Sequence, residues 1–133
     1  MLTLTCRMIN AYPSFLLNES VKSFLGPTSI KTKPELVAKV KVAVKANRIL
    51  SAGHCIDSVV LLRSDTSRIL KMTNVPVLVI AGEEDQTIPV AEVKLMADAI
   101  GCQFLELAKI GHLAALESPD EVNAIIENFL QKH

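Results

Sequence analysis

Asp85 and His112 are the residues of this sequence whose types and surroundings point to chemistry. Asp85 lies in a polar loop, residues 82–87, that follows an apolar run, and His112 follows Gly111 behind a second strand candidate, residues 102–107. An ordinary histidine has a pKa of roughly 6.5, so near neutral pH it can take a proton from a nucleophile and return it. A carboxylate on the other ring nitrogen fixes the tautomer and stabilises the imidazolium. Taken singly, each residue also has a structural reading, as a turn-forming aspartate and a packed histidine.

The elements that would position this pair form a βαβ unit. Residues 75–81 are short, β-branched and apolar on both alternating faces, which is typical of a buried strand in a parallel sheet. Pro89 and Gly101 bound an amphipathic helix over residues 90–100, and residues 102–107 form a second strand. Loops that leave the carboxyl ends of neighbouring parallel strands meet at one edge of the sheet. We therefore expect Asp85 and His112 to lie within hydrogen-bonding reach, with Gly111 allowing a tight turn.

The last element is an amphipathic helix over residues 119–131. Ser118 is predicted to be its N-cap, Pro119 its first residue and Glu121 the partner in a capping box. Its apolar stripe comprises Val122, Ile125, Ile126, Phe129 and Leu130.

The chain changes character near residue 70. Upstream, residues 12–25 and 35–50 are predicted helices, and residues 56–62 fit either a strand or a helix. We divide the chain into a helical segment, residues 1–68, and a βαβα segment, residues 69–133.

Composition excludes several classes of protein. The chain has 133 residues, half of them apolar, with 14 basic and 14 acidic side chains and no net charge. A neutral chain without a basic stripe predicts no nucleic-acid partner and no membrane-surface partner. Three cysteines (Cys6, Cys55 and Cys102) at irregular spacing predict reduced thiols in a cytoplasmic protein, and no cluster has zinc spacing. We read no signal peptide at the N-terminus.

Residues 75–85, with Ile88, Pro89 and Val90, resemble the acid-bearing strand and loop of the α/β-hydrolase family. Residues 110–113, 116–119 and 122–130 resemble its histidine loop and final helix. The branch that they resemble most comprises small ester and lactone hydrolases and includes 3-oxoadipate enol-lactonase. The clear resemblance covers about residues 69–131, and a weaker one to the family's helical lid covers about residues 24–68.

This resemblance implies a partial α/β-hydrolase fold: a helical lid segment, then the last two parallel strands with flanking helices. It implies that Asp85 is the acid and His112 the base of a catalytic triad. The expected reaction is hydrolysis of a small carboxylic ester or lactone through an acyl-enzyme, with no metal or organic cofactor.

The sequence departs from the family at the nucleophile. The family places its serine in a G-x-S-x-G elbow upstream of the acid, and none of the five glycines here frames a serine in that way. We therefore expect the chain alone to be inactive, as a truncated or split product whose partner is an upstream nucleophile-bearing chain or a second copy. The alternatives are a non-catalytic interaction module and an inactive gene product. Cys55, between His54 and Asp57, is a weaker nucleophile candidate because no second glycine and no strand frame it.

Overall fold

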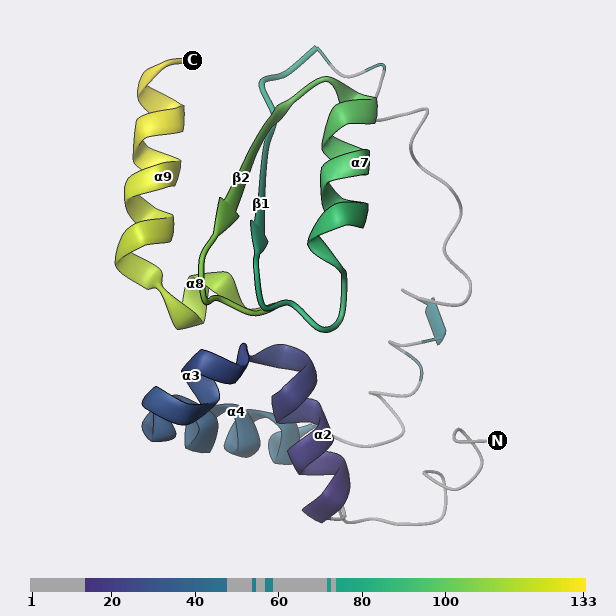
Figure 1. Cartoon of the computed structure of the whole chain (residues 1–133), viewed down its shortest axis with the longest axis vertical. Helices are drawn as coiled ribbons and strands as arrows, with labels where there is room; N and C mark the ends of the chain where they lie inside the picture. The colour runs from purple at the N-terminus through teal and green to yellow at the C-terminus, as the bar shows by residue number, and fades with distance from the viewer. Residues whose placement is uncertain (1–13, 48–53, 55–56, 59–71, 73) are drawn as a thin grey trace.

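The computed structural model describes residues 14–47, 54, 57–58, 72 and 74–133 (Figure 1). In chain order its helices and strands are α2 (Ser14–Phe24), α3 (Pro27–Thr32), α4 (Pro34–Ala46), β1 (Leu78–Gly82), α7 (Val90–Ile100), β2 (Gln103–Leu107), α8 (Ala114–Glu117) and α9 (Pro119–Gln131). The division at residues 68 and 69 falls outside these residues, and so does most of the segment 56–62.

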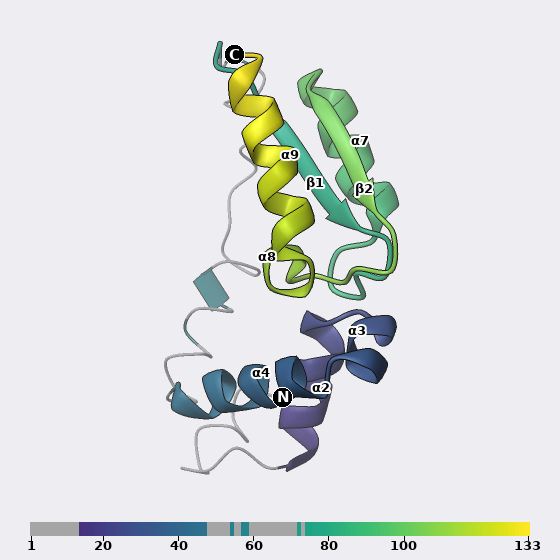
Figure 2. The ribbon, with the colours of Figure 1, turned by 90° about the vertical axis from the view of Figure 1, so that its left-hand side faces the viewer.

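The two strands are parallel, as the sequence predicts. They pair from Leu78 opposite Gln103 to Gly82 opposite Leu107, and α7 connects them. Figures 1 and 2 show α7 and α9 on opposite faces of these strands. The fold is therefore mixed α/β, with both faces of the strand pair covered by helices.

β1 begins three residues later than predicted. Pro76 has no N–H to donate, and the next residue of β2 in register, Cys102, donates its N–H to Ala97 O at the end of α7. Gly101 adopts the left-handed conformation (φ 76°) that this helix end requires. The end of α7 thus takes up the Cys102 N–H, the backbone group that would otherwise extend the hydrogen bonding between β1 and β2.

α4 ends at Ala46, short of the predicted residue 50. Asn47 is extended, and its side-chain amide donates to Ala43 O at 2.7 Å. An asparagine that bonds the backbone in this way competes with helical hydrogen bonds, which explains the early end. α2 lies within its predicted range, whose first residues fall outside the described part.

The capping box predicted at Ser118 is absent. Ser118 is the N-cap residue of α9, but its hydroxyl donates to the carboxylate of Glu121 at 3.0 Å rather than accepting a backbone N–H. The Ser118 N–H donates to Ala114 O, because α8 runs directly into α9. The bend between these two helices therefore replaces the standard cap.

Two apolar clusters hold the described residues together. The first lies among α2, α3 and α4 and is built on Val21, Leu25, Leu36 and Val40. The second joins the sheet to α9 and is built on Leu107, Ile110 and Val122. The predicted stripe of α9 is only partly covered, since Ile126 and Leu130 are 42% and 67% exposed.

The helices α2, α3 and α4 lie beyond the carboxyl ends of both strands, next to the loops that leave them (Figure 1). No described helix combines the length and the apolar character needed to cross a membrane.

Candidate active site

The loop after β1 orients Asp85 through its own backbone. One oxygen, Oδ1, accepts hydrogen bonds from Thr87 N at 2.7 Å and Ile88 N at 3.0 Å. The Asp85 N–H donates to Gly82 O at 3.1 Å, which closes the turn. The side chain is 9% exposed, and Oδ2 remains for a partner outside the loop.

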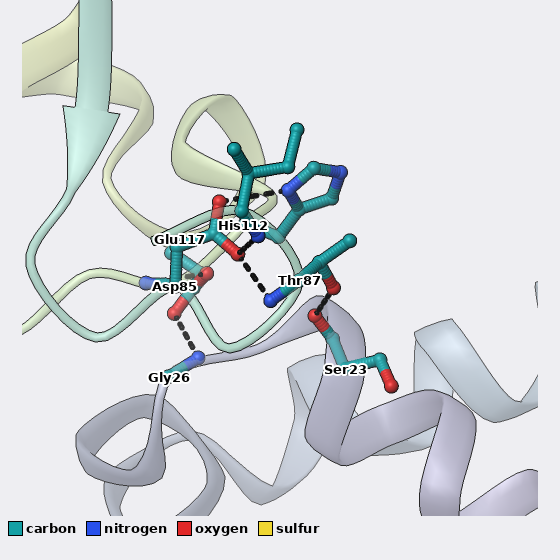
Figure 3. A network of polar contacts seen from close by, with 8 residues as sticks. Ser23, Gly26, Asp85, Thr87, His112 and Glu117 are labelled. Atoms are coloured by element: carbon teal, nitrogen blue, oxygen red, sulfur yellow. Dashed lines mark hydrogen bonds and ion pairs between the residues drawn. The ribbon is translucent and has the colours of Figure 1, made fainter. Parts of the chain in front are cut away.

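That partner is His112. Its Nδ1 lies 2.8 Å from Asp85 Oδ2 (Figure 3), so the expected proximity of the two residues is confirmed. An ionised carboxylate only accepts, so a neutral imidazole in this arrangement carries its proton on Nδ1 and a lone pair on Nε2. Figure 3 shows the second ring nitrogen pointing away from Asp85, and the side chain is 30% exposed. The pair has the geometry of a base held in one tautomer by an acid.

The corner between α2 and α3, residues 23–28, contacts both loops. Ser23 O accepts from Thr87 Oγ1 at 2.7 Å, on the acid side. Phe24 O accepts from Leu113 N at 3.0 Å, on the histidine side, and the Phe24 ring stacks on the His112 ring at a centroid distance of 6.4 Å. We call residues 23–28 the helical corner.

Glu84, in the polar loop after β1, is part of this contact. Its carboxylate accepts from Thr28 N at 2.7 Å and from Thr28 Oγ1 at 2.6 Å. Glu83, by contrast, is exposed and accepts from Lys109 N at 2.8 Å within the sheet-edge loops. The two neighbouring glutamates therefore serve different parts of the molecule.

Gly111 acts differently from our expectation. The residue with a positive φ in this loop is Lys109, at 61°, so the tight backbone turn lies two residues earlier. A Cβ added to Gly111 would lie 2.1 Å from Gly26 N and 2.6 Å from Leu25 C. The glycine is needed for close approach of the histidine loop to the helical corner.

Glu117 is the functional candidate that sequence reasoning missed. It is 1% exposed, and its two oxygens accept from Gly26 N and Gly111 N, each at 3.0 Å (Figure 3). Lys33 Nζ donates to the backbone carbonyl of Glu117. The one signal in the sequence was a lone charged residue after the apolar residues 113–116.

The other candidates do not join this site. Cys102 is half-buried, with Sγ 3.7 Å from Ala97 O, whereas Cys6 and Cys55 lie outside the described residues. Within the described residues, no group of three or more histidine, cysteine, aspartate and glutamate side chains is arranged to hold a metal ion.

The fold corresponds to the C-terminal portion of an α/β-hydrolase. A family profile described as TAP-like protein matches residues 41–133, well over half of the chain. The chain therefore belongs to this α/β-hydrolase family.

Curated relatives agree with this assignment. The chain is 26% identical over 106 residues to 3-oxoadipate enol-lactonase 2 of Acinetobacter baylyi, covering 80% of this chain and 39% of that protein. It is 40% identical over 57 residues to human Protein ABHD8, covering 42% of this chain and 13% of that protein.

Solved structures show the same fold. A thermophilic esterase from Thermogutta terrifontis superposes with a TM-score of 0.83 at 23% identity, over 98% of this chain and 47% of that one. MGS-M2, an α/β-hydrolase from a Medee basin deep-sea metagenome library, gives a TM-score of 0.77 at 16% identity, over 97% and 48%. Est816, described as an N-acyl homoserine lactone degrading enzyme, gives a TM-score of 0.67 at 24% identity, over 86% and 46%. The chain spans less than half the length of each of these proteins.

Proposed function

We propose that this chain supplies the acid, Asp85, and the base, His112, of a serine-hydrolase triad. The observation that carries the proposal is the 2.8 Å contact between Asp85 Oδ2 and His112 Nδ1 at the carboxyl edge of two parallel strands. The proposed substrates are small carboxylic esters or lactones, the classes named for the esterase and the lactonases among its relatives. Residues 1–68 would form the lid segment and residues 69–133 the core segment.

The chemistry follows from the ring orientation. Nε2 takes the proton of a serine hydroxyl as its oxygen attacks the substrate carbonyl carbon, and Asp85 stabilises the imidazolium that forms. Nε2–H then protonates the leaving alkoxide, which departs and leaves an acyl-serine. Water repeats the cycle through the same nitrogen and releases the acid. The serine would come from a second polypeptide segment that carries a G-x-S-x-G elbow.

A fusion tests this proposal. The chain is joined behind the part of the Thermogutta terrifontis esterase that it does not match, and hydrolysis of short activated esters is measured. We expect activity from the fusion and none from the chain alone. In the fusion, His112→Ala and Asp85→Asn should each lower kcat/KM by about 10⁴-fold, whereas Glu127→Gln, on the exposed side of α9, should not.

Two outcomes contradict the proposal. If the fusion is active and both variants keep that activity, the pair is not catalytic. If the chain alone hydrolyses esters and loses that activity with His112→Ala, the nucleophile lies within it, and Cys55 becomes the candidate.

A second role, as a non-catalytic interaction module, is favoured by the exposed apolar residues Ile126 and Leu130 of α9. A fusion that folds but stays inactive would support it. The cytoplasmic location, inferred from the cysteine pattern, stays a prediction.

A further inference from the structure

The Glu117 carboxylate joins two segments that are far apart in the sequence. Gly26 is 91 residues away from it and Gly111 is six residues away, and both N–H groups are buried at the contact. Each carboxylate oxygen accepts one of them, so the ionised side chain satisfies both donors. A glutamine in the same place would turn its NH₂ group toward one N–H and leave that donor unpaired.

The position of this contact matters because Gly111 directly precedes His112. On the other side of the histidine, Leu113 N donates to Phe24 O. The backbone of His112 is therefore held on both sides by the helical corner, once directly and once through Glu117. A triad base must stay within about 0.5 Å of its productive position, and these two contacts hold its backbone on both sides.

We propose that Glu117 is a positioning residue for His112. Its buried carboxylate couples the docking of the helical corner to the placement of the imidazole against Asp85. Its two oxygens bond Gly26 N and Gly111 N, so it acts through the backbone of Gly111 and not on a reacting group. This inference rests on the proposed function, in which the Asp85–His112 contact is the acid–base pair of the triad.

The tautomer of His112 shows whether Glu117 holds the imidazole in place against Asp85. Imidazole ¹⁵N chemical shifts of the full chain are measured over a series of alkaline pH values, and those of the neutral side chain are compared. In the wild type, the hydrogen bond to Asp85 should make the Nδ1–H form dominant. In Glu117→Gln, the loop is released and the two tautomers should become comparably populated.

Two control variants separate positioning from general stability. Glu127→Gln makes the same chemical change on the exposed surface of α9. Val122→Ala removes a buried side chain, 6% exposed, from the cluster between α9 and the sheet. Both should keep the Nδ1–H form at temperatures where they remain folded, although Val122→Ala lowers stability.

Asp85→Asn distinguishes failure of this inference from failure of the proposed function. If the wild type lacks the Nδ1–H form, or if the Asp85→Asn variant keeps it, the assignment of Asp85 and His112 as an acid–base pair is contradicted, and the proposed function fails with it. A wild type with the Nδ1–H form that is lost in Asp85→Asn but kept in Glu117→Gln would leave the pair intact and overturn the role of Glu117.

Amide exchange in the wild-type chain keeps the inference testable if Glu117→Gln does not fold. Since one carboxylate holds both donors, the amide hydrogens of Gly26 and Gly111 should be protected to a similar degree and should open together. Exchange of either amide at the rate of an unprotected backbone group would overturn the proposal.

Discussion

Asp85 uses its two carboxylate oxygens for different purposes. Oδ1 closes the turn after β1 by accepting from Thr87 N and Ile88 N, and Oδ2 faces His112. Asp85 can therefore form the turn and also act as the proposed acid, because the turn orients its second oxygen toward His112. An aspartate reaches its own backbone two or three residues ahead.

Gly111→Ala tests the close approach at the residue scale. The added Cβ would overlap Gly26 N, and backbone on both sides leaves little room to yield, so we expect a loss of about 3 kcal/mol or more in the free energy of unfolding. The matched control is Gly101→Ala, where a Cβ meets nothing within 4 Å and the cost is the left-handed φ alone, about 1–2 kcal/mol. Urea denaturation measures both, and equal losses would contradict a steric role for Gly111.

The helical corner is the element that brings the two loops together. On the acid side it contacts Thr87 and Glu84, and on the histidine side it contacts Leu113 and, through Glu117, Gly111. The helices that carry it, α2, α3 and α4, pack among themselves through Val21, Leu25, Leu36 and Val40. The helices thus form an apolar cluster of their own, which meets the loops after the strands through these polar contacts and through Leu113.

Glu84→Ala should loosen this contact on one side. The hydrogen bonds that Glu84 accepts from Thr28 involve a charged group, and such bonds contribute about 1.5–3 kcal/mol each. We expect exchange of the Thr28 amide hydrogen to accelerate by roughly ten- to a hundredfold. Glu83→Ala is the matched control, since Glu83 bonds Lys109 N instead, and it should leave Thr28 unchanged. Equal acceleration in both variants would contradict the assigned partners.

The sequence predicted these elements where their signals are local. Proline and glycine boundaries and apolar spacing placed α7 and α9 within a residue of their observed ends, and the parallel pairing followed from the uniform apolar character of residues 75–81. The Asp85–His112 contact followed from strand topology.

Glu84 and Glu117 were not predictable in this way. Their partners Thr28 and Gly26 lie 56 and 91 residues away. Nearly every residue has a backbone N–H, so the sequence does not indicate which of these groups will be the partner. The late start of β1 was missed for a related reason, since it depends on the hydrogen bond that Cys102 N gives to α7.

At the scale of the whole molecule, the sheet of the described residues has only two strands and therefore open edges. Within the described residues β1 pairs with β2 alone, so its other edge presents unpaired backbone groups. Ile126 and Leu130 leave apolar surface on α9. Open strand edges and exposed apolar surface both favour association.

We therefore expect the chain to self-associate in solution. Size-exclusion chromatography with light scattering, over a range of concentrations, should give masses above 14.5 kDa that fall on dilution. The double variant Ile126→Lys and Leu130→Lys should shift the equilibrium toward monomer. Phe15→Lys is the control, because Phe15 is an apolar residue of α2 that is 65% exposed. It should leave the equilibrium between monomer and oligomer unchanged. A monomer peak that does not change with concentration would contradict this expectation.

The contacts of the helical corner have a consequence for divergence among relatives. Gly26 N, Thr28 N, Ser23 O and Phe24 O all take part as backbone groups. Every residue supplies the carbonyl, and every residue other than proline supplies the N–H. Selection on substrate preference can therefore rewrite most side chains of α2, α3 and α4 without moving the corner. The positions that we expect to resist exchange are those whose side chain, or its absence, makes one of these contacts: Gly26, Thr28, Glu84, Thr87, Gly111 and Glu117. Grafting α2, α3 and α4 from one relative onto another should succeed when the residues at these positions are transferred together with the helices.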